Sequence, residues 1–272
     1  MISGNISKMQ TRLTDTVAYE LPIGDEKVAM NEFIGREITL TYSGVINCVH
    51  CGRKTKKSYS QGHCYPCMIK LASCDMCIVK PETCHFDQGT CREPEWALTH
   101  CMQPHYVYLS NSSGVKVGIT RETQIPTRWI DQGAIQALPI AKLDTRYHVG
   151  LMEVAIKSQL ADKTNWRKML KNETEELDLK EIRDQIFNSC SSEIDALAQR
   201  FGRENLTLLE KAEQVEISYP VLEYPEKIKA WNFDKTAEVT GVLKGIKGQY
   251  LIFDTGVLNI RKFSGYEVRL FI

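Results

Sequence analysis

Alternating apolar and polar residues mark both ends of the chain. The N-terminal runs VAYELPI and EITLTYSGVI read as strands broken by Gly, Asp and Asn. The C-terminal runs EVTGVLKGI, QYLIFD, VLNIRKF and YEVRLFI alternate in the same way and are separated by glycine-containing dipeptides. We predict an N-terminal β segment (1–47) and a C-terminal β meander (216–272), which are candidates to form a small barrel together. No internal repeat is apparent apart from the Cys-x-x-Cys pairs.

Two other hydrophobic patterns fill the second half of the chain. Residues 104–170 read as strand, turn, strand, helix, strand and helix, through HYVYLS, VKVGIT, IPTRWIDQGA, ALPIAKLDT and a helix over 146–162. From 171 to 215, Leu and Ile recur at three- and four-residue separations among charged residues, which is typical of amphipathic helices. The sequence therefore predicts an α+β protein.

Residues 48–103 differ from the rest of the chain because they show almost no hydrophobic periodicity and are rich in Cys, Gly and Pro. This stretch has too little apolar content to build a core of its own, so bound metal must supply the missing stability. The expected organisation is a β segment, a zinc-binding region, an α+β module, a helical segment and a β meander, at 1–47, 48–103, 104–170, 171–215 and 216–272.

The composition of the chain is that of an ordinary globular protein, with 272 residues, 43% of them hydrophobic and 25% charged. No stretch approaches the roughly 18 apolar residues that a spanning helix needs. The start, MISGNISKMQTRLTD, lacks the apolar run of a secretory signal, so we expect a cytoplasmic location and no membrane partner. The ten cysteines then favour reduced thiols held by metal over disulfides.

Four cysteines form the clearest candidate metal site. Cys48 and Cys51 in CVHCG, and Cys64 and Cys67 in CYPC, make two Cys-x-x-Cys pairs with twelve residues between them. Each pair can place two thiolates on one ion, and two pairs complete a tetrahedral Zn(Cys)4 site. A thioredoxin-like redox pair lacks its βαβ context here. An iron–sulfur cluster, or crossed ligation with the next site, stays open.

A second cysteine cluster follows immediately. The sequence predicts another Zn(Cys)4 site there, with Cys101 as an alternative for one of its four ligands, and hence about two structural zinc ions per chain. The tenth cysteine, Cys190, lies far away in a predicted helix, where we expect it to have a structural role. The four ligands expected at the second site are Cys74, Cys77, Cys84 and Cys91.

The net charge is zero but unevenly distributed. Residues 41–73 carry five Lys or Arg and no Asp or Glu, whereas 171–215 carry six basic and eleven acidic residues. A basic zinc region is compatible with nucleic-acid binding, although basic side chains in a loop are equally compatible with a solvated surface. The candidate phosphate contacts are Arg53, Lys54, Lys56, Lys57, Lys116 and Arg121.

The α+β module resembles the GIY-YIG superfamily of nucleases over residues 105–170. The family pattern is an aromatic strand, a turn, a second strand with a conserved glycine motif, and a helix carrying an arginine. Here these parts are Tyr106–Tyr108, then Lys116–Thr120, then Arg128. The resemblance implies cleavage of DNA with one divalent cation, Mg²⁺ or Mn²⁺.

The resemblance also implies a role for each candidate catalytic residue. A phenol, of Tyr106 or Tyr108, would help to deprotonate water, and Arg128 would stabilise the charge of the phosphorane. A glutamate on the next helix would hold the cation. Lys116 stands where the second tyrosine of the family name is expected, as in the branch that reads KIG. A protonated lysine can neutralise a phosphate but is a poor substitute for a phenol.

Glu153 is the candidate for that glutamate. At about 100° per residue it falls inside the apolar stripe that runs from Val149 to Leu160. A carboxylate on a buried face needs a partner. The partner is either the divalent cation or a salt bridge to Lys157 or Arg146.

The run of motifs along nearly the whole chain also resembles the bacterial DUF2797 family, which is known only as a domain of unknown function and supplies no activity. Three hypotheses follow. The first is a zinc-stabilised nucleic-acid-binding protein whose GIY-YIG-like module is a Mg²⁺-dependent endonuclease. The second is a non-catalytic nucleic-acid-binding module. The third is a protein-interaction scaffold, in which the zinc knuckles and acidic helices dock a partner protein.

Overall fold

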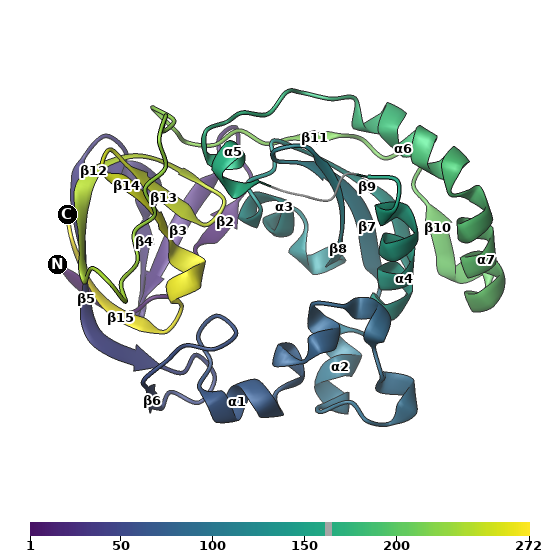
Figure 1. Ribbon diagram of the computed structural model, residues 1–272, viewed down its shortest axis with the longest axis horizontal. Helices are drawn as coiled ribbons and strands as arrows, with labels where there is room; N and C mark the ends of the chain where they lie inside the picture. The colour runs from purple at the N-terminus through teal and green to yellow at the C-terminus, as the bar shows by residue number, and fades with distance from the viewer. Residues whose placement is uncertain (161–164) are drawn as a thin grey trace.

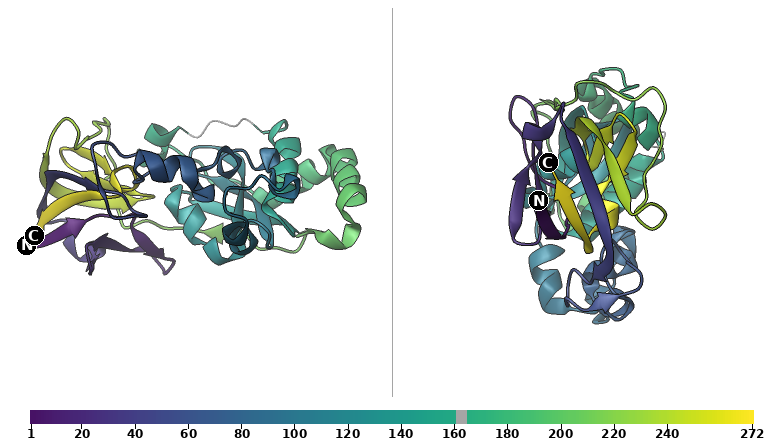
Figure 2. Two further views of the ribbon diagram at one scale, coloured as in Figure 1. Left: turned by 90° about the horizontal axis from the view of Figure 1, so that it is seen from below. Right: turned by 90° about the vertical axis from the view of Figure 1, so that its left-hand side faces the viewer.

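The computed structural model describes residues 1–160 and 165–272, and its strands form three sheets. Figure 1 shows a β-rich part and an α+β part side by side, with the cysteine-rich segment running from one to the other below them. Both ends of the chain lie next to each other in the β-rich part, as the views in Figure 2 also show. In the described residues, no helix is long and apolar enough to cross a bilayer.

The terminal segments form one antiparallel sheet in the order β1-β15-β5-β12-β13-β14, with β6 added to β5. The predicted association of the N- and C-terminal strands is therefore confirmed. Its strands are β1 (Ile2–Asn5), β5 (Glu37–Asn47), β6 (Lys54–Thr55), β12 (Glu238–Lys247), β13 (Tyr250–Phe253), β14 (Gly256–Asn259) and β15 (Tyr266–Phe271).

The predicted barrel is wrong, because the sheet does not close. A separate small sheet holds β2 (Gln10–Arg12), β3 (Ala18–Ile23) and β4 (Glu26–Ala29). This small sheet meets the large one through an isolated bridge between Ile6 and Ile23, not through a continuous ladder. Two stacked sheets bury the same apolar faces that a closed barrel would bury, so the alternating pattern could not distinguish the two arrangements.

The two β segments repeat one local pattern. The β3–β4 hairpin leads through a 3-10 helix, Met30–Phe33, into β5, and the β13–β14 hairpin leads through a 3-10 helix, Ile260–Phe263, into β15. Gly35 and Gly265 follow these helices with φ angles of 87° and 86°. The strands β5 and β15 then pair antiparallel with each other. The sequence does not reveal this duplication, because few of the equivalent side chains are identical.

The α+β part follows the predicted order of elements in the described residues. Its helix α4 covers the sheet β10-β9-β7-β8, and β11 pairs with β9. The helix predicted over 146–162 ends at Lys157, and residues 161–162 of that prediction lie outside the described residues. The elements are β7 (His105–Asn111), β8 (Val115–Arg121), α3 (Thr127–Asp131), β9 (Gln136–Leu143), α4 (Arg146–Lys157) and α5 (Trp166–Leu170).

The segment 171–215 is helical only in part. It forms α6 (Leu179–Ser189) and α7 (Ser191–Phe201), and then β10 (Leu206–Leu208) and β11 (Val215–Glu216), which both pair with β9. Gly202, with φ 92°, follows α7 and turns the chain back toward the sheet. The helical periodicity predicted up to residue 215 is therefore wrong beyond α7, because strand pairing with β9 outweighs local propensity.

The α+β part and the β-rich part share one core. Tyr108, Trp129 and Ile130 belong to the same buried cluster as side chains of β5, β12 and β15. A polar contact adds to this joint, because Asp131 accepts hydrogen bonds from Lys8 Nζ and Gln249 Nε2, both at 2.8 Å. A second core lies on the other face of the sheet, between β7, β9, α4 and α6.

The cysteine-rich segment contains short elements, and the longest are α1 (Tyr65–Lys70) and α2 (Pro94–His100). It packs against α4 where Gly150 meets Pro81, because a Cβ on Gly150 would overlap the Pro81 ring. The segment therefore lies directly beside the helix that carries Glu153.

Candidate metal centre and basic cavity

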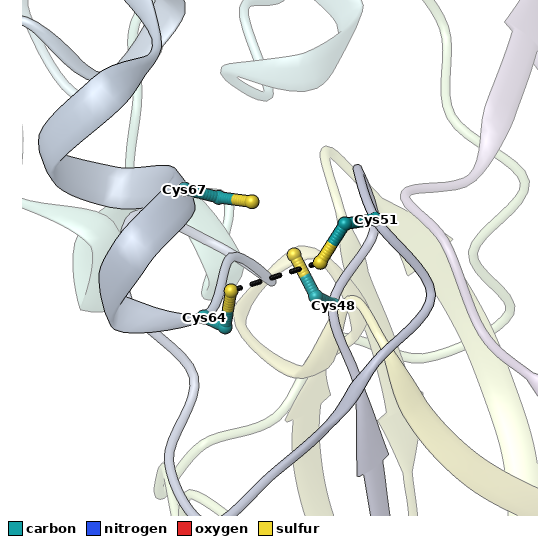
Figure 3. A group of neighbouring side chains, drawn as sticks. All are labelled: Cys48, Cys51, Cys64 and Cys67. Carbon is teal, nitrogen blue, oxygen red and sulfur yellow. Dashed lines mark hydrogen bonds between the residues drawn. The ribbon is translucent and has the colours of Figure 1, made fainter.

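Four thiols meet at one point, as predicted. The sulfurs of the first two cysteine pairs all lie within 4.8 Å of one another, and Figure 3 shows them pointing toward a common centre. Cys51 Sγ and Cys64 Sγ are 3.8 Å apart. Two ligands about 2.3 Å from a tetrahedral ion stand roughly 3.8 Å apart, so the group fits a structural zinc. Its residues are Cys48, Cys51, Cys64 and Cys67.

The local backbone prepares these sulfurs for metal. Cys48 N–H donates to Arg53 O, and Gly52 N–H donates to Cys48 O, which closes a tight knuckle around the first pair. Burial alone would raise the pKa of Cys48, but backbone N–H groups of Cys51, Cys64 and His50 point at its sulfur and lower the pKa to about 6. A thiolate that is stable at neutral pH is the form that binds metal.

The pKa of Cys67, the last cysteine of the second pair, shifts in the opposite direction. Burial raises the pKa of Cys67 to about 12, and the neighbouring sulfurs of Cys64, Cys51 and Cys48 add to the shift. Four thiolates cannot share one small volume without a cation. A zinc ion held by these four cysteines would remove this conflict, because it would neutralise the thiolates.

At the second predicted metal site, Cys74 has surroundings that it shares with the first site. Cys74 packs against the buried cluster of the first site and also lines the cavity described below. The metal-donor atoms that lie within 4.8 Å of one another here belong to Asp75, Cys77 and His85.

A cavity of about 640 Å³ opens between the three parts of the chain. The N-terminal β segment contributes Lys8, and the 3-10 helix before β15 contributes Arg261. The cysteine-rich segment contributes Ser60, Gln61 and part of 73–81. Strand β8 and helices α3 and α4 supply the remaining wall. Its charged lining residues are Lys8, Lys116, Arg121, Arg128, Arg146 and Arg261, with Asp75, Asp131 and Glu153.

Three of the five predicted catalytic residues line this cavity, namely Lys116, Arg128 and Glu153. Tyr108 lies directly beneath its wall, because the Cβ position of Gly118 is 2.7 Å from the Tyr108 hydroxyl oxygen. The Tyr108 hydroxyl donates to Gln132 Oε1 at 3.1 Å, and Gln132 also lines the cavity. Gly118 is thus required for close approach of β8 to the phenol.

The fifth predicted residue, Tyr106, lies elsewhere. Its hydroxyl donates to Glu122 Oε1 at 3.0 Å, and Lys142 Nζ lies 5.3 Å from its ring centroid. Tyr106 and Tyr108 point to the same face of β7, but only Tyr108 lies under the cavity wall.

Glu153 is half-buried, and the charges around it are mixed. Burial raises the pKa of its carboxyl group, and the positive charges of Lys157, Arg146 and Arg128 work against that shift. Both partners considered in the sequence, Lys157 and Arg146, therefore act on Glu153. A carboxylate that faces a cavity and has a raised pKa is a candidate for cation binding.

The predicted phosphate contacts fall into three places. Lys116 and Arg121 line the cavity, whereas Lys56 and Lys57 line a second hollow of about 680 Å³ that shares Gln61 and Arg261 with it. Arg53 lies beside the first cysteine pair, where the Cys51 sulfur raises the pKa of its guanidinium group. Lys54 is exposed on β6, next to that pair.

Lys8 and Arg261 belong to the cavity but were not predicted as site residues. Nothing near them in the sequence marks them, because each lies in a terminal β segment whose pattern indicates strands. Arg146 was considered only as a salt-bridge partner. Its Nη2 donates to Ile78 O at 2.6 Å, and its Nε is buried without a partner in the described residues.

One comparison with known proteins identifies the family. Residues 35–268 match the model of a family described as "Protein of unknown function (DUF2797)". The chain belongs to the DUF2797 family. The match includes both cysteine clusters and every cavity residue except Lys8. No curated protein and no solved structure matches this DUF2797 protein.

Proposed function

We propose that the DUF2797 protein binds nucleic acid in the basic cavity and hydrolyses a phosphodiester there with one divalent cation. The observation that carries this proposal is that three arginines from three elements, Arg128, Arg146 and Arg261, line one cavity. Burial lowers the pKa of Arg146, and the charge of Arg128 lowers it further. Burial and then Arg128 lower the pKa of Arg261 in the same way.

Converging guanidinium groups repel one another unless an anion lies between them. A phosphate diester is such an anion, and planar guanidinium forks bind it with paired hydrogen bonds. The cavity lining has six basic and three acidic residues, so it favours an anion even though the whole chain is neutral.

A basic path leads out of the cavity. The second hollow, which shares Gln61 and Arg261 with the cavity, is also lined by Lys56, Lys57 and Lys262. Successive basic side chains along a groove can track a phosphate backbone. This continuity supports a polymeric substrate over a small phosphate ester.

The resemblance to GIY-YIG nucleases assigns the roles. The two motif strands, β7 and β8, are neighbours, and Arg128 follows on α3. Tyr108, not Tyr106, then assists deprotonation of the attacking water, and Arg128 stabilises the phosphorane charge. Glu153 would hold Mg²⁺ or Mn²⁺ in this arrangement. The ion would supply positive charge to the reacting phosphate.

A non-catalytic binding module is the second candidate, and the environment of Tyr108 favours it. The Tyr108 phenol is fully buried, and burial raises its pKa. Lys116 stands where the family pattern has its other phenol. If neither group can move a proton, the same arginines still bind phosphate.

Labelled linear and branched DNA, and RNA of the same sequence, test the proposal with Mg²⁺ or Mn²⁺ present. The wild-type protein binds at low salt and cuts when the metal is added. Glu153→Gln retains binding and loses cutting, whereas Arg128→Ala loses both. Exposed residues of α7 and of the turn after it supply matched controls, Glu193→Gln and Arg203→Ala, which retain both activities.

Three outcomes would change the assignment. Cutting by Glu153→Gln and Arg128→Ala at the wild-type rate excludes this cavity as the active site. Binding without cutting by all proteins, lost in Arg128→Ala, establishes the non-catalytic module. Absence of polynucleotide binding at low salt leaves a protein-interaction scaffold as the remaining hypothesis.

A further inference from the structure

We propose that Cys77, Cys84, Cys91 and Cys101 bind a second structural zinc ion, and that Cys74 is not one of its ligands. The sequence had favoured Cys74 and left Cys101 as an alternative. The structure favours Cys101, because the residues next to these four cysteines are bonded to one another around a single point.

The loop between Cys84 and Cys91 is closed on itself. His85 Nδ1 and Thr90 Oγ1 are 2.7 Å apart, and Thr90 Oγ1 also donates to His85 O at 3.3 Å. Gly89, with φ 71°, provides the turn between them. Because His85 directly follows Cys84 and Thr90 directly precedes Cys91, this contact holds the two cysteines together at the base of the loop.

Asp75 connects that loop to Cys77. Its Oδ2 lies 2.6 Å from Arg92 Nε and 3.7 Å from His85 Nε2, and its Oδ1 accepts a hydrogen bond from Cys77 N–H at 3.4 Å. One carboxylate thus contacts Cys77 itself and the neighbours of Cys84 and Cys91.

Arg146 attaches Cys101 to the same point. Its backbone N–H donates to Cys101 O at 2.8 Å, and its Nη2 donates to Ile78 O at 2.6 Å, next to Cys77. Cys101 is buried. A buried thiol at the base of α4, linked through Arg146 to the residue after Cys77, is well placed to be a ligand.

Cys74 differs from these four cysteines, because it packs with the first cysteine cluster.

Asp75, Cys77 and His85 form the competing set of ligands, because their donor atoms already lie within 4.8 Å of one another. In that set Asp75 is held by Arg92, and His85 Nδ1 faces Thr90. Among the described residues, the four sulfurs of the proposed site do not all lie within 4.8 Å of one another, unlike those of the first site, so binding one ion would require rotation about χ1. Thiolates are also the stronger zinc ligands.

Metal analysis of purified full-length protein tests the proposal. We expect about two zinc ions per chain in the wild type and in Cys74→Ser, and about one in Cys101→Ser and Cys84→Ser. His85→Ala retains two. Co²⁺ substitution gives a second readout, because the charge-transfer absorption of an all-thiolate site falls by about half when one of two such sites is lost.

Circular dichroism of each variant shows whether the chain is folded. If Cys101→Ser does not fold, Cys84→Ser and the conservative variant Cys101→His carry the test, because His can replace Cys as a zinc ligand. Loss of one zinc from Cys74→Ser but not from Cys101→Ser overturns the proposal. Loss from His85→Ala with retention in Cys84→Ser assigns the ion to the Asp75 set and overturns it as well. A wild-type content of one zinc also overturns it.

Discussion

Arg261 and Arg128 line the same cavity, although one lies in the C-terminal β segment and the other on α3. Burial lowers the pKa of Arg261, and the positive charge of Arg128 lowers it further. Arg261 Nε donates to Gln61 Oε1 at 2.7 Å, so the cysteine-rich segment holds the side chain in this position.

Arg261→Gln tests the contribution of the β segment to nucleic-acid binding. If Arg261 contacts a phosphate, the variant binds every polynucleotide more weakly, and the slope of log affinity against log salt falls by about 1. The control is Arg203→Gln, an arginine that is 74% exposed and paired with Asp195. A fluorescence titration at several salt concentrations measures the affinity and the salt slope of each variant. An unchanged slope for Arg261→Gln would show that this arginine makes no phosphate contact.

Removal of zinc from the first site should destabilise the protein. Cys67→Ser removes one sulfur of the four-cysteine group, and we expect this variant to lose one zinc ion and at least about 5 °C of Tm, at about 2–4 °C per kcal/mol. Treatment of the wild type with a strong chelator should lower Tm at least as much. The control is Cys190→Ala, which changes a buried cysteine in the second core and should leave the zinc content of the protein unchanged. A Tm that does not respond to chelator contradicts a structural role for metal.

Lys247 makes the stability depend on pH in the alkaline range. Its side chain is buried, and burial lowers its pKa to about 8, although Nζ donates to Asn172 Oδ1 at 2.7 Å. Between pH 8 and about 10.5 the unfolded state binds a proton that the folded state does not. Stability from this group therefore rises with pH across that window and is lost as pH falls through 8.

Lys247→Met removes this dependence. We expect the free energy of unfolding of the wild type, relative to the variant, to rise by up to about 3 kcal/mol from pH 8 to 10.5. Denaturant titrations of both proteins across this range measure the difference, in which titrating groups away from Lys247 cancel. A difference that stays constant with pH would mean that Lys247 keeps its ordinary pKa.

The duplicated pattern supplies a matched pair of glycines. Gly35 and Gly265 have the same backbone conformation, with φ 87° and 86°. A Cβ on Gly35 would meet Leu222 Cδ1 at 3.5 Å, whereas one on Gly265 would overlap the carbonyl oxygen of Asn47. Gly35→Ala should cost about 1–2 kcal/mol, from the left-handed conformation alone. Gly265→Ala should cost more, by about 2 kcal/mol, and urea unfolding compares the two. Equal costs would show that the second contact relaxes freely.

The sequence alone determined the four-cysteine group of the first candidate metal site. Cys48, Cys51, Cys64 and Cys67 could be assigned because a Cys-x-x-Cys knuckle is a local structure, and two knuckles separated by a short loop can meet without help from the rest of the fold. The strands and helices of the α+β part could be predicted for a similar reason, since hydrophobic periodicity records which face of each element is buried.

Only the tertiary structure decided which tyrosine lies under the cavity and which residues form its walls. Alternation in β7 puts Tyr106 and Tyr108 on one face, but the packing of Gly118 and α3 selects Tyr108. Arg261 and Lys8 reach the cavity because the two chain ends share a sheet, and its side chains belong to the same buried cluster as Trp129 and Ile130 of α3. Contacts between segments far apart in the chain depend on the whole core, and no local pattern records them.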